Sequence, residues 1–234
     1  MRALIVGASG GLGAAFVVQL AGDSRFSHVT GWSRSAIPAA HDKVSTTRID
    51  LRDEATIEAA AQGLGEVDLV VIATGLLHDG DLKPEKTWRS LDPSMMMRVF
   101  EINTIGPALV AKHVLPLLPH DRRAVFAALS ARVGSISDNQ LGGWHSYRAS
   151  KSALNQLIRC FSIELAAKRP QAICVGLHPG TVDTDLSKPY QADVPDDKLF
   201  TAELSARRLL GVLDTLNPAQ SGRVFDWAGI EILA

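Results

Sequence analysis

The sequence has little cysteine, almost no net charge and no long apolar run. Only two of its 234 residues are cysteines, Cys160 and Cys174, and neither belongs to a CxxC pair or a Cys/His cluster. We therefore expect two buried free thiols in a reducing compartment. The same scarcity gives no motif for a bound metal.

The near-neutral charge and the short apolar runs exclude further classes of protein. A formal net charge of −1 gives no electrostatic reason to expect nucleic acid or an anionic membrane as partner. No apolar run approaches the ~20 residues that span a bilayer, and MRALIVGASGG at the N-terminus lacks the pattern of a signal peptide. We expect a cytoplasmic enzyme or binding protein.

The composition and periodicity predict one folded α/β domain over residues 1–234. Hydrophobic residues make up 46 % and charged residues 21 % of the chain, which is typical of a globular protein. Short apolar runs alternate with segments of helical period, so we predict a doubly wound, seven-stranded, mostly parallel sheet with helices on both faces. The expected strands are 3–6, 28–32, 44–49, 67–73, 124–130, 171–177 and 221–227, and the expected helices are 11–22, 53–65, 85–118 (interrupted), 146–168 and 202–216.

A glycine-rich loop, VGASGGLG (6–13), follows the first expected strand and opens the first helix. Glycines at such a place permit a tight turn and let backbone N–H groups approach a pyrophosphate at the helix N-terminus. The loop predicts a dinucleotide site, whose residues here are Gly7, Ser9, Gly11, Leu12 and Gly13.

The end of the second strand bears on the choice of cofactor. NAD sites of this fold usually carry an acidic residue there for the ribose 2′-hydroxyl. TGWSRS instead offers Ser33 and Arg34. The guanidinium of Arg34 could bind a 2′-phosphate, which favours NADP, although a solvated loop arginine is the alternative.

The ends of the third and fourth strands supply further candidate cofactor contacts. Asp50 and Leu51 could give an adenine its acceptor and its apolar wall, although Asp50 could also simply begin a helix. The small residues Ala73, Thr74 and Gly75 would let backbone lie against a ribose, or form an ordinary strand-end turn.

YRASK (147–151) carries Tyr147 and Lys151 one helical turn apart on one face. A free tyrosine has a pKa of about 10, and a nearby positive charge would lower that pKa and help proton transfer. Taken alone, the pair is also a common feature of surface helices.

With INTIGP (102–107) and HPGTVDT (178–184), these motifs make the chain resemble the short-chain dehydrogenase/reductase family over nearly its whole length. The stretch ALSARVGSISDNQLGGWHSYRASK is similar to the carbonyl-reductase-like branch that contains the C-factor and sniffer proteins. The resemblance implies a single Rossmann domain that binds NADP(H).

The resemblance also implies roles for three residues. Tyr147 would donate a proton to the substrate carbonyl oxygen, and Lys151 would bond the nicotinamide ribose hydroxyls. Asn103 would hold a kinked helix and, with a water, connect the lysine to a proton relay. A merely structural helix break at Gly106-Pro107 is the alternative for Asn103.

Several positions are candidates for the serine that the family places near the catalytic tyrosine. The family usually reads Ser-Ser after the fifth strand, where this chain reads Leu129-Ser130-Ala131. Ser130 is the preferred candidate if a bulge turns it inward, and Ser135 or Ser137 could substitute. If Gly134 anchors the comparison, Ala131 occupies the expected position.

HPGTVDT is expected to face the nicotinamide. Pro179 and Gly180 form a rigid turn without side-chain bulk, and by resemblance Val182 and Thr184 would bond the carboxamide through backbone and side chain, respectively. His178 before the proline suggests a structural or pocket-wall role.

Two further segments are expected near the substrate. Residues 184–200 form a long Pro- and Asp-rich stretch without clear period, which predicts a substrate lid or, alternatively, a disordered excursion. We expect Leu77, Leu141, Trp144 and His145 to line the substrate pocket.

These observations predict an NADPH-dependent oxidoreductase that reduces an aldehyde, ketone or quinone carbonyl. The alternative is an NADP-binding regulatory or signalling protein with weak or vestigial reductase activity, which the Ser130/Ala131 pattern keeps open. The expected partners are a small-molecule substrate and, as family members often pair, a second copy of the chain. Met95–Met97 are expected in a core or interface.

Overall fold

The computed structural model describes residues 1–35 and 41–233 and contains an eight-stranded sheet in the order β10-β9-β6-β5-β4-β1-β2-β3. All of its pairings are parallel except β9 with β10. The predicted α/β fold is confirmed, with one strand more than the seven expected. The strands are β1 (Arg2–Val6), β2 (His28–Ser33), β3 (Val44–Arg48), β4 (Leu69–Ile72), β5 (Ala124–Leu129), β6 (Ala172–His178), β9 (Val224–Asp226) and β10 (Glu231–Ile232).

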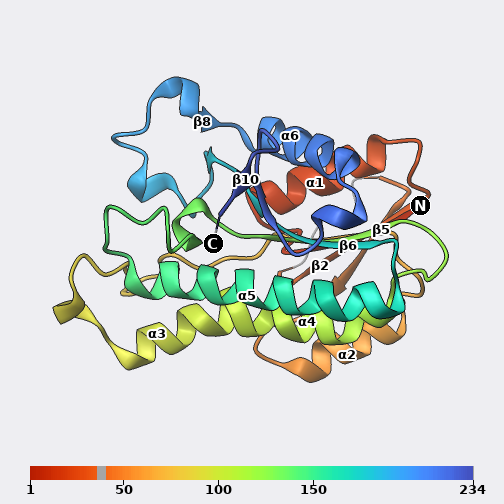
Figure 1. Ribbon diagram of the computed structural model, residues 1–234, viewed down its shortest axis with the longest axis horizontal. Coiled ribbons are helices and arrows are strands. Elements are labelled where there is room, and N and C mark those ends of the chain that lie inside the picture. The colour runs from red at the N-terminus through yellow and green to blue at the C-terminus, as the bar shows by residue number, and fades with distance from the viewer. Residues whose placement is uncertain (36–40, 234) are drawn as a thin grey trace.

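Helices cover both faces of the sheet (Figure 1). One face carries α1 (Gly11–Gly22) and α6 (Ala202–Thr215), and the other carries α2 (Glu54–Gln62), α4 (Gly106–Val114) and α5 (His145–Lys168). α3 (Pro93–Phe100) packs against α5. The central strands β4 and β5 are buried at every residue because helices shield both of their faces.

The helical region expected over 85–118 is divided in the structure. A 3₁₀ turn (Trp88–Ser90) precedes α3, which starts at Pro93 because the Asp92 side chain caps it by accepting from the Met95 N–H (2.9 Å). A π-helical turn (Glu101–Ile105) joins α3 to α4, and a 3₁₀ turn (Leu115–Leu117) follows.

A small ribbon closes the segment expected to be a lid. β7 (Thr181–Val182) pairs with β8 (Leu199–Phe200), and the chain between them contains 3₁₀ turns at Lys188–Tyr190 and Asp196–Lys198. Further 3₁₀ turns lie at Arg132–Gly134 and Pro218–Gln220. The segment is therefore an ordered loop with paired ends, which stands out beside β8 in Figure 1.

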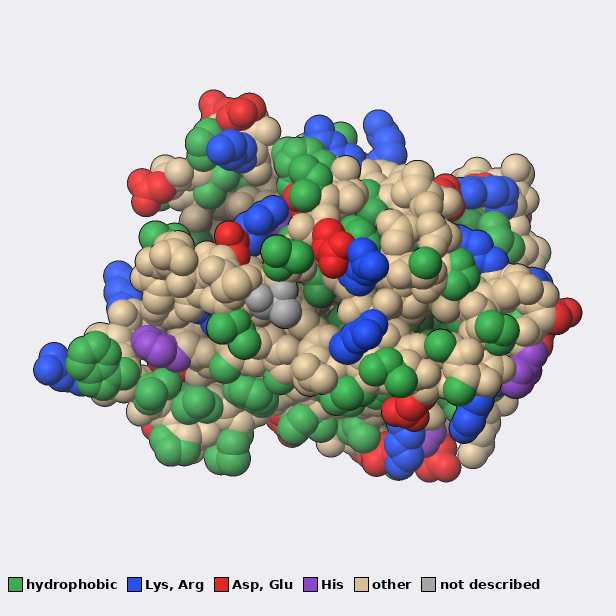
Figure 2. Space-filling model, viewed as in Figure 1, with side chains coloured by type: hydrophobic (Ala, Val, Ile, Leu, Met, Phe, Trp, Pro, Cys, Tyr) green, Lys and Arg blue, Asp and Glu red, His purple; other side chains and the backbone are tan. Residues whose placement is uncertain are grey.

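Part of the molecular surface is apolar. Figure 2 shows apolar side chains along the side of the molecule formed by α3, α4 and α5, and Met97, Ile105 and Ile163 are exposed on these elements and the π turn. The homodimer stays a prediction.

Cys174 is buried as expected, but Cys160 is exposed, which corrects that expectation. Across residues 1–35 and 41–233, no helix has the length and apolarity that crossing a bilayer requires.

Candidate active site

A cavity of about 560 Å³ lies at the edge of the sheet where the parallel strands end. Open parallel sheets bind ligands at this edge, because the loops that follow the strands converge there. The walls come from the glycine loop, the ends of β4, β5 and β6, the first turns of α5, and the lid segment. Most of the predicted site residues line this space, namely Gly11, Leu12, Ala73, Thr74, Gly75, Ser130, Tyr147, Lys151, Pro179, Gly180, Val182 and Thr184. The other predicted residues are not among its described lining residues: Gly7, Ser9, Gly13, Ser33, Arg34, Asp50, Leu51 and Asn103.

The glycine loop has the geometry that its sequence predicted. Gly7 has a φ of +87°, in the left-handed region that favours glycine. A Cβ on Gly13 would overlap the Gly7 carbonyl oxygen, and a Cβ on Gly11 would lie 2.8 Å from Cγ2 of Thr184. Leu12 lines the cavity and Ser9 is exposed on the loop. At positions 7 and 13 the backbone itself favours glycine, so the loop stays free of side chains there.

The end of β2 presents positive charge. Arg34 is exposed, and the Ser33 hydroxyl donates to the Ser35 carbonyl. Arg52 bonds both carboxylate oxygens of Asp50 (3.3 and 3.2 Å), and this pairing holds the pKa of Asp50 below its usual value, with a smaller contribution from the charge of Arg34. Arg52 is therefore a second cation at this corner that motif reasoning missed, although it follows IDL directly in the sequence.

Leu51 and the turn at 73–75 have different surroundings, since only the turn borders the cavity. Leu51 is buried against Gly106, where a Cβ would be 2.8 Å from the leucine Cβ. Ala73, Thr74 and Gly75 line the cavity. The Thr74 hydroxyl is a buried polar group without a hydrogen-bond partner among the described residues, which is an uncommon state for such a group. It is a candidate contact for a bound cofactor.

Asn103 is fully buried in the π turn and joins three elements. Its side-chain oxygen accepts from the Leu76 N–H (2.7 Å), and its amide nitrogen donates to the Leu76 carbonyl (2.9 Å) and the Ser150 hydroxyl (3.1 Å). Because Pro107 has no N–H, the Asn103 carbonyl has no helical partner four residues on. The interruption predicted here takes the form of a π turn.

Tyr147 and Lys151 lie together in the first turns of α5 and line the cavity. The Lys151 ammonium is buried, donates to the Leu129 carbonyl (2.8 Å) and lies 5.8 Å from the centre of the Tyr147 ring. Burial raises the pKa of Tyr147 to about 12 and lowers the pKa of Lys151 to about 8. The direction for Tyr147 is opposite to the one expected from charge alone, because desolvation of the phenolate outweighs the nearby ammonium.

Ser130 and Ala131 both border the cavity, but they point to different sides. The Ser130 N–H continues the β5–β6 ladder to the Leu177 carbonyl (2.8 Å), and its hydroxyl donates to the side-chain oxygen of Asn155 on α5 (2.6 Å). Ala131 is also extended (φ −151°, ψ 148°), so its methyl group leaves on the opposite side from Ser130. The bulge that would turn Ser130 inward is not formed there.

The other serines are farther along the same loop. Ser135 is buried, and its hydroxyl lies 3.3 Å from the Ser137 hydroxyl and accepts from the Asp138 N–H (3.1 Å). Within the described chain, neither Ser135 nor Ser137 borders the cavity. Of the three serines considered, Ser130 is the one that borders the cavity, with its hydroxyl bonded to Asn155.

The turn after β6 is held from behind. The Ser205 hydroxyl donates to the Pro179 carbonyl (2.8 Å), and Gly180 has a φ of +78° with a Cβ position only 2.7 Å from the Phe200 ring. Val182 and Thr184 line the cavity beside this turn. At Gly180 the backbone is thus presented to the cavity without a side chain.

Aromatic rings at the cavity connect the 184–200 segment with the start of α5. The Trp144 ring is 5.1 Å from the Tyr190 ring and 6.2 Å from the Tyr147 ring, and the His78 ring is 5.8 Å from that of Tyr190. Leu77 also lines the cavity as expected. The expectation that Leu141 lines the pocket is wrong, because its side chain is 91 % exposed in the loop before α5.

Two histidines lie near the site, and they differ in their relation to the cavity. Burial lowers the pKa of His178 to about 4, and its Nδ1 is buried without a partner among described residues, which agrees with a pocket-wall role. His145, expected at the pocket, is not among the described residues that line it. Arg132 was missed by motif reasoning; it borders the cavity and pairs with Asp226 (3.2 Å).

Metal ligation has no support in the described chain. No group of three or more His, Cys, Asp or Glu side chains is close enough there to hold an ion.

The family follows from comparison with known proteins. The model of the short chain dehydrogenase family matches residues 1–195, which is most of the chain. The protein therefore belongs to the short-chain dehydrogenase/reductase family, a family of oxidoreductases, and the resemblance inferred from the motifs is confirmed.

Particular relatives agree with this assignment. The C-signal protein of Myxococcus xanthus is 40 % identical over 143 residues, covering 61 % of this chain and 80 % of the relative. A 1-hydroxy-2-glutathionyl-2-methyl-3-butene dehydrogenase of Rhodococcus sp. (strain AD45) is 34 % identical over 179 residues, covering 75 % of this chain and 74 % of that protein.

Solved structures reproduce the whole fold. The NADPH-bound carbonyl reductase from chicken fatty liver is 27 % identical, with a TM-score of 0.87 over 100 % of this chain and 98 % of the other. The carbonyl reductase Sniffer of D. melanogaster matches with a TM-score of 0.87 at 23 % identity over 100 % and 99 % of the two chains, which shows the shared fold.

Proposed function

We propose that the protein is an NADPH-dependent carbonyl reductase that converts an aldehyde, ketone or quinone into an alcohol. The observation that carries the proposal is the buried Tyr147–Lys151 pair, which borders the same cavity as the glycine loop. A proton donor and a pyrophosphate cradle on one cavity are the two parts that hydride reduction of a carbonyl requires. The substrate is a small molecule, and the cytoplasm is the expected location.

The described residues fit a dinucleotide cofactor. The cradle at Gly7, Gly11 and Gly13 excludes side chains, and the buried Thr74 hydroxyl has an unused hydrogen-bonding capacity. The chicken carbonyl reductase that resembles this chain over its full length holds NADPH. When bound, NADPH supplies the hydride.

At the other end of the cofactor site, Arg34 and Arg52 would hold a 2′-phosphate. Pro179, Gly180, Val182 and Thr184 would face the nicotinamide. Ser33, Asp50, Leu51, Ala73 and Gly75 complete the site that we propose.

Tyr147 gives its proton to the substrate oxygen during reduction. Burial raises its pKa to about 12, so the phenol is protonated throughout the physiological range, and its proton donation depends on stabilising the phenolate that remains. The charge left on the phenolate is stabilised by the Lys151 ammonium, which is cationic below its pKa of about 8. Asn103, whose side chain is bonded to Ser150 and Leu76, would hold through its backbone carbonyl a water that connects Lys151 to a proton relay.

Ser130 is proposed to bond the substrate oxygen as negative charge develops there. Its hydroxyl now donates to the Asn155 side-chain oxygen. The amide of Asn155 can be reversed so that its nitrogen donates to Ser130, which frees the hydroxyl hydrogen for a substrate. The lid (184–200), whose Tyr190 packs on Trp144, would exclude water from the reacting atoms.

NADPH oxidation tests the proposal directly. Purified protein is mixed with NADPH and a panel of aldehydes, ketones and quinones, and the NADPH absorbance is followed beside a Tyr147→Phe variant. We expect turnover by the wild type, at least about 100-fold slower in the variant with an unchanged Kd for NADPH. Turnover that survives in Tyr147→Phe would defeat the assignment of the proton donor.

One observation favours a second candidate function. The Ser130 hydroxyl is engaged by Asn155 and the next residue is Ala131, so the developing charge would lack one of its usual donors. An NADP-binding regulatory or signalling protein with weak reductase activity would have such a site, and the relative from Myxococcus xanthus is named C-signal. Tight binding of NADPH without turnover on any member of the panel would favour this candidate.

A further inference from the structure

A buried carboxylate holds the start of α5, and no motif pointed to it. Glu85 is 7 % exposed, and both partners of its carboxylate are neutral groups of Ser146. One oxygen accepts from the Ser146 backbone N–H (3.1 Å) and the other from the Ser146 hydroxyl. The Glu85 backbone carbonyl also accepts from the Trp144 N–H (2.5 Å). Glu85 therefore bonds Trp144 through its backbone carbonyl and Ser146 through its carboxylate.

The segment that Glu85 binds has an unusual backbone. Gly142, Gly143 and Trp144 have φ values of 64°, 65° and 51° in succession. Among the described residues, Trp144 is the only non-glycine with a positive φ. A bulky residue in this conformation costs roughly 1–2 kcal/mol, and such strain persists only where the surroundings impose it. The bonds from Glu85 are part of those surroundings.

The strained turn leads directly into the catalytic residue. Ser146 precedes Tyr147 in the chain, and the Trp144 ring packs edge-on against the rings of both Tyr147 and Tyr190. Glu85, Ser146 and Tyr147 also border a second, small cavity beside the main one. A movement of this turn would shift the phenol relative to the substrate, and misplacement by about 1 Å can cost about 100-fold in rate.

We propose that Glu85 is a positioning residue for the reductase reaction, which holds the 144–146 turn so that the phenol of Tyr147 faces the substrate and stays shielded from water. The inference rests on the proposed function. The carboxylate also lies at the N-terminus of α5, where the helix dipole favours a negative charge.

Variants at positions 85 and 147 test this role by kinetics. Glu85→Ala should lower kcat about 30-fold and leave the Kd for NADPH unchanged, because the cofactor cradle is elsewhere. Glu85→Gln should recover most of that loss, because its amide oxygen can accept from the Ser146 N–H while its amide nitrogen donates to the hydroxyl. In a Tyr147→Phe background, Glu85→Ala should cause no further decrease, as Glu85 acts through Tyr147.

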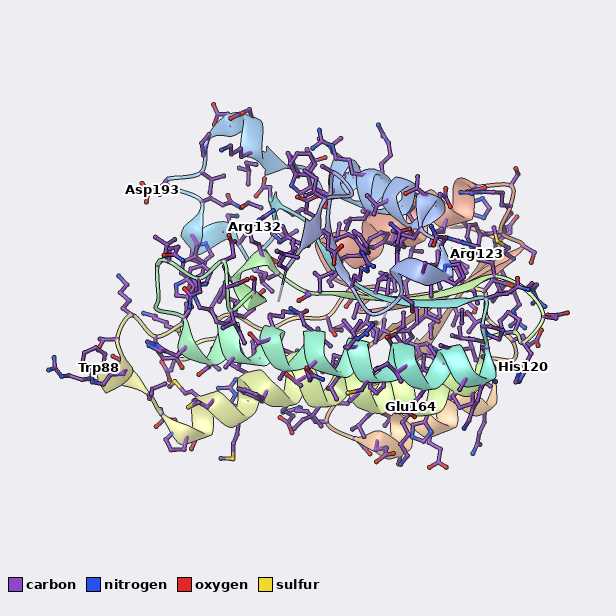
Figure 3. All side chains as sticks on the ribbon, viewed as in Figure 1. Trp88, His120, Arg123, Arg132, Glu164 and Asp193 are labelled. Atoms are coloured by element: carbon purple, nitrogen blue, oxygen red, sulfur yellow. The ribbon has the colours of Figure 1, made fainter. Side chains whose placement is uncertain are left out.

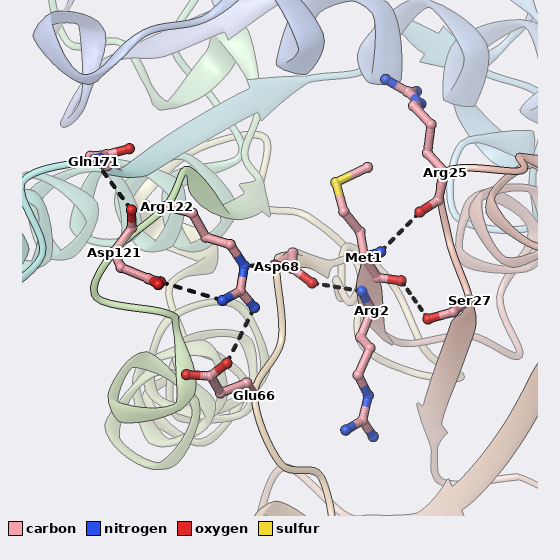
Figure 4. Close-up of polar contacts among 9 residues, drawn as sticks. All are labelled: Met1, Arg2, Arg25, Ser27, Glu66, Asp68, Asp121, Arg122 and Gln171. Atoms are coloured by element: carbon pink, nitrogen blue, oxygen red, sulfur yellow. Dashed lines mark hydrogen bonds and ion pairs between the residues drawn. The ribbon is translucent and has the colours of Figure 1, made fainter.

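The matched control is Asp68→Asn. Asp68 is also 7 % exposed and also accepts a backbone N–H (Arg2, 2.7 Å; Figure 4), but it directly precedes β4, at the end of the sheet where the parallel strands begin. This variant should lose stability without losing kcat. An equal fall of kcat in Asp68→Asn and Glu85→Ala, or an undiminished effect of Glu85→Ala in the Tyr147→Phe background, would overturn the proposal.

A measurement without turnover separates this inference from the proposed function. The chain has two tyrosines, Tyr147 and Tyr190, so protein labelled at the tyrosine Cζ carbon gives two NMR signals, which Tyr190→Phe assigns. In the wild type, burial raises the pKa of Tyr147 to about 12. In Glu85→Ala we expect Tyr147 to ionise closer to the ordinary pKa of about 10, because water reaches the phenol.

The two failures are therefore distinct. A changed Tyr147 titration in a protein that reduces no carbonyl would defeat the proposed function and leave the positioning role of Glu85 standing. An unchanged titration in Glu85→Ala, in a protein that does reduce carbonyls, would overturn the role of Glu85 alone.

Discussion

At the end of the sheet where the parallel strands begin, which we call the amino-terminal edge, the buried carboxylate of Asp68 has a partner on each oxygen. Asp68 accepts from the Arg2 backbone N–H and pairs with Arg122 (2.9 Å), whose remaining nitrogens contact Glu66 and Asp121 (Figure 4). Satisfied groups of this kind tie loops to strands, and they leave no unused donor or acceptor for a ligand.

At the carboxyl edge the polar groups are in a different state. Thr74 Oγ1, His145 Nδ1 and His178 Nδ1 are buried and, within residues 1–35 and 41–233, have no hydrogen-bond partner. In Figure 3, Arg132 and Asp193 mark this end of the molecule, and His120 and Arg123 mark the other. A fourth atom of this kind, Arg208 Nη1, lies in α6. Buried polar groups without a protein partner are candidates to bind a cofactor or substrate, whereas the paired carboxylate of Asp68 is not.

The largest expected effect comes from Lys151, at the reactive edge. Lys151→Met should lower kcat for carbonyl reduction about 1000-fold, because the phenolate formed during proton donation loses its counter-charge. In the wild type, kcat should decrease above pH about 8, where the buried ammonium loses its proton, while Tyr147 with a pKa of about 12 is still protonated. Initial rates of NADPH oxidation between pH 6 and 10 measure both effects.

The variant itself is the control for the pH effect. The decrease above pH about 8 should be missing in Lys151→Met. A variant that keeps the same decrease would assign it to another group.

Ser130 and Ala131 give the next largest effect. Ser130→Ala should lower kcat about 100-fold if its hydroxyl bonds the developing oxyanion. Ala131→Ser should bring little change, because position 130 already supplies the donor. Stopped-flow single turnovers with bound NADPH isolate the chemical step. The reverse result, an unaffected Ser130→Ala and a faster Ala131→Ser, would place the functional position at 131.

Arg34 tests the cofactor end of the same edge. Arg34→Ala should raise the Kd for NADPH about 10- to 100-fold and change the Kd for NADH little, since only NADPH offers a 2′-phosphate. Separate titrations that follow the fluorescence of NADPH and of NADH give the two dissociation constants. Arg25→Ala is the comparison at the opposite edge, because Arg25 pairs with Asp214 (3.0 Å) away from the cavity. Equal losses for both cofactors would contradict 2′-phosphate recognition by Arg34.

The smallest effect on activity is expected at the amino-terminal edge. Asp68→Asn should lower the free energy of unfolding by about 2 kcal/mol, because the Arg122 pair is weakened and a buried acceptor is altered. Its kcat should stay within about twofold of the wild type. Urea unfolding and the NADPH assay report the two quantities. A large fall of kcat with an intact fold would mean that the two edges are not independent.

Much of the site could be predicted because its signals are local. The positions of Gly7 and Gly13 follow from the backbone geometry of one loop, and helix 145–168 was expected from period alone at 146–168. The seven expected strands were found, but β10 was missed because two residues, Glu231–Ile232, carry no period. Arg52 and Arg132 were missed because a lone arginine beside a motif has no pattern of its own.

The contacts that hold the site are long-range, and the sequence does not indicate them. Glu85 and Ser146 are 61 positions apart, and Ser130 and Asn155 are 25 apart. Nothing in YRASK or LSAR shows which side chain lies opposite, because that depends on how α5 packs beside β5 and the loop that carries Glu85.

The sequence by itself determined the glycine cradle, the Tyr147–Lys151 spacing and the alternation that builds a parallel sheet, because each depends on neighbours within one or two turns of chain. Only the tertiary structure decided which way the pKa of Tyr147 moves, which side Ser130 faces, and that Glu85 holds the turn before Tyr147. Burial and partnership are properties of residues brought together from distant parts of the chain, and packing alone creates them.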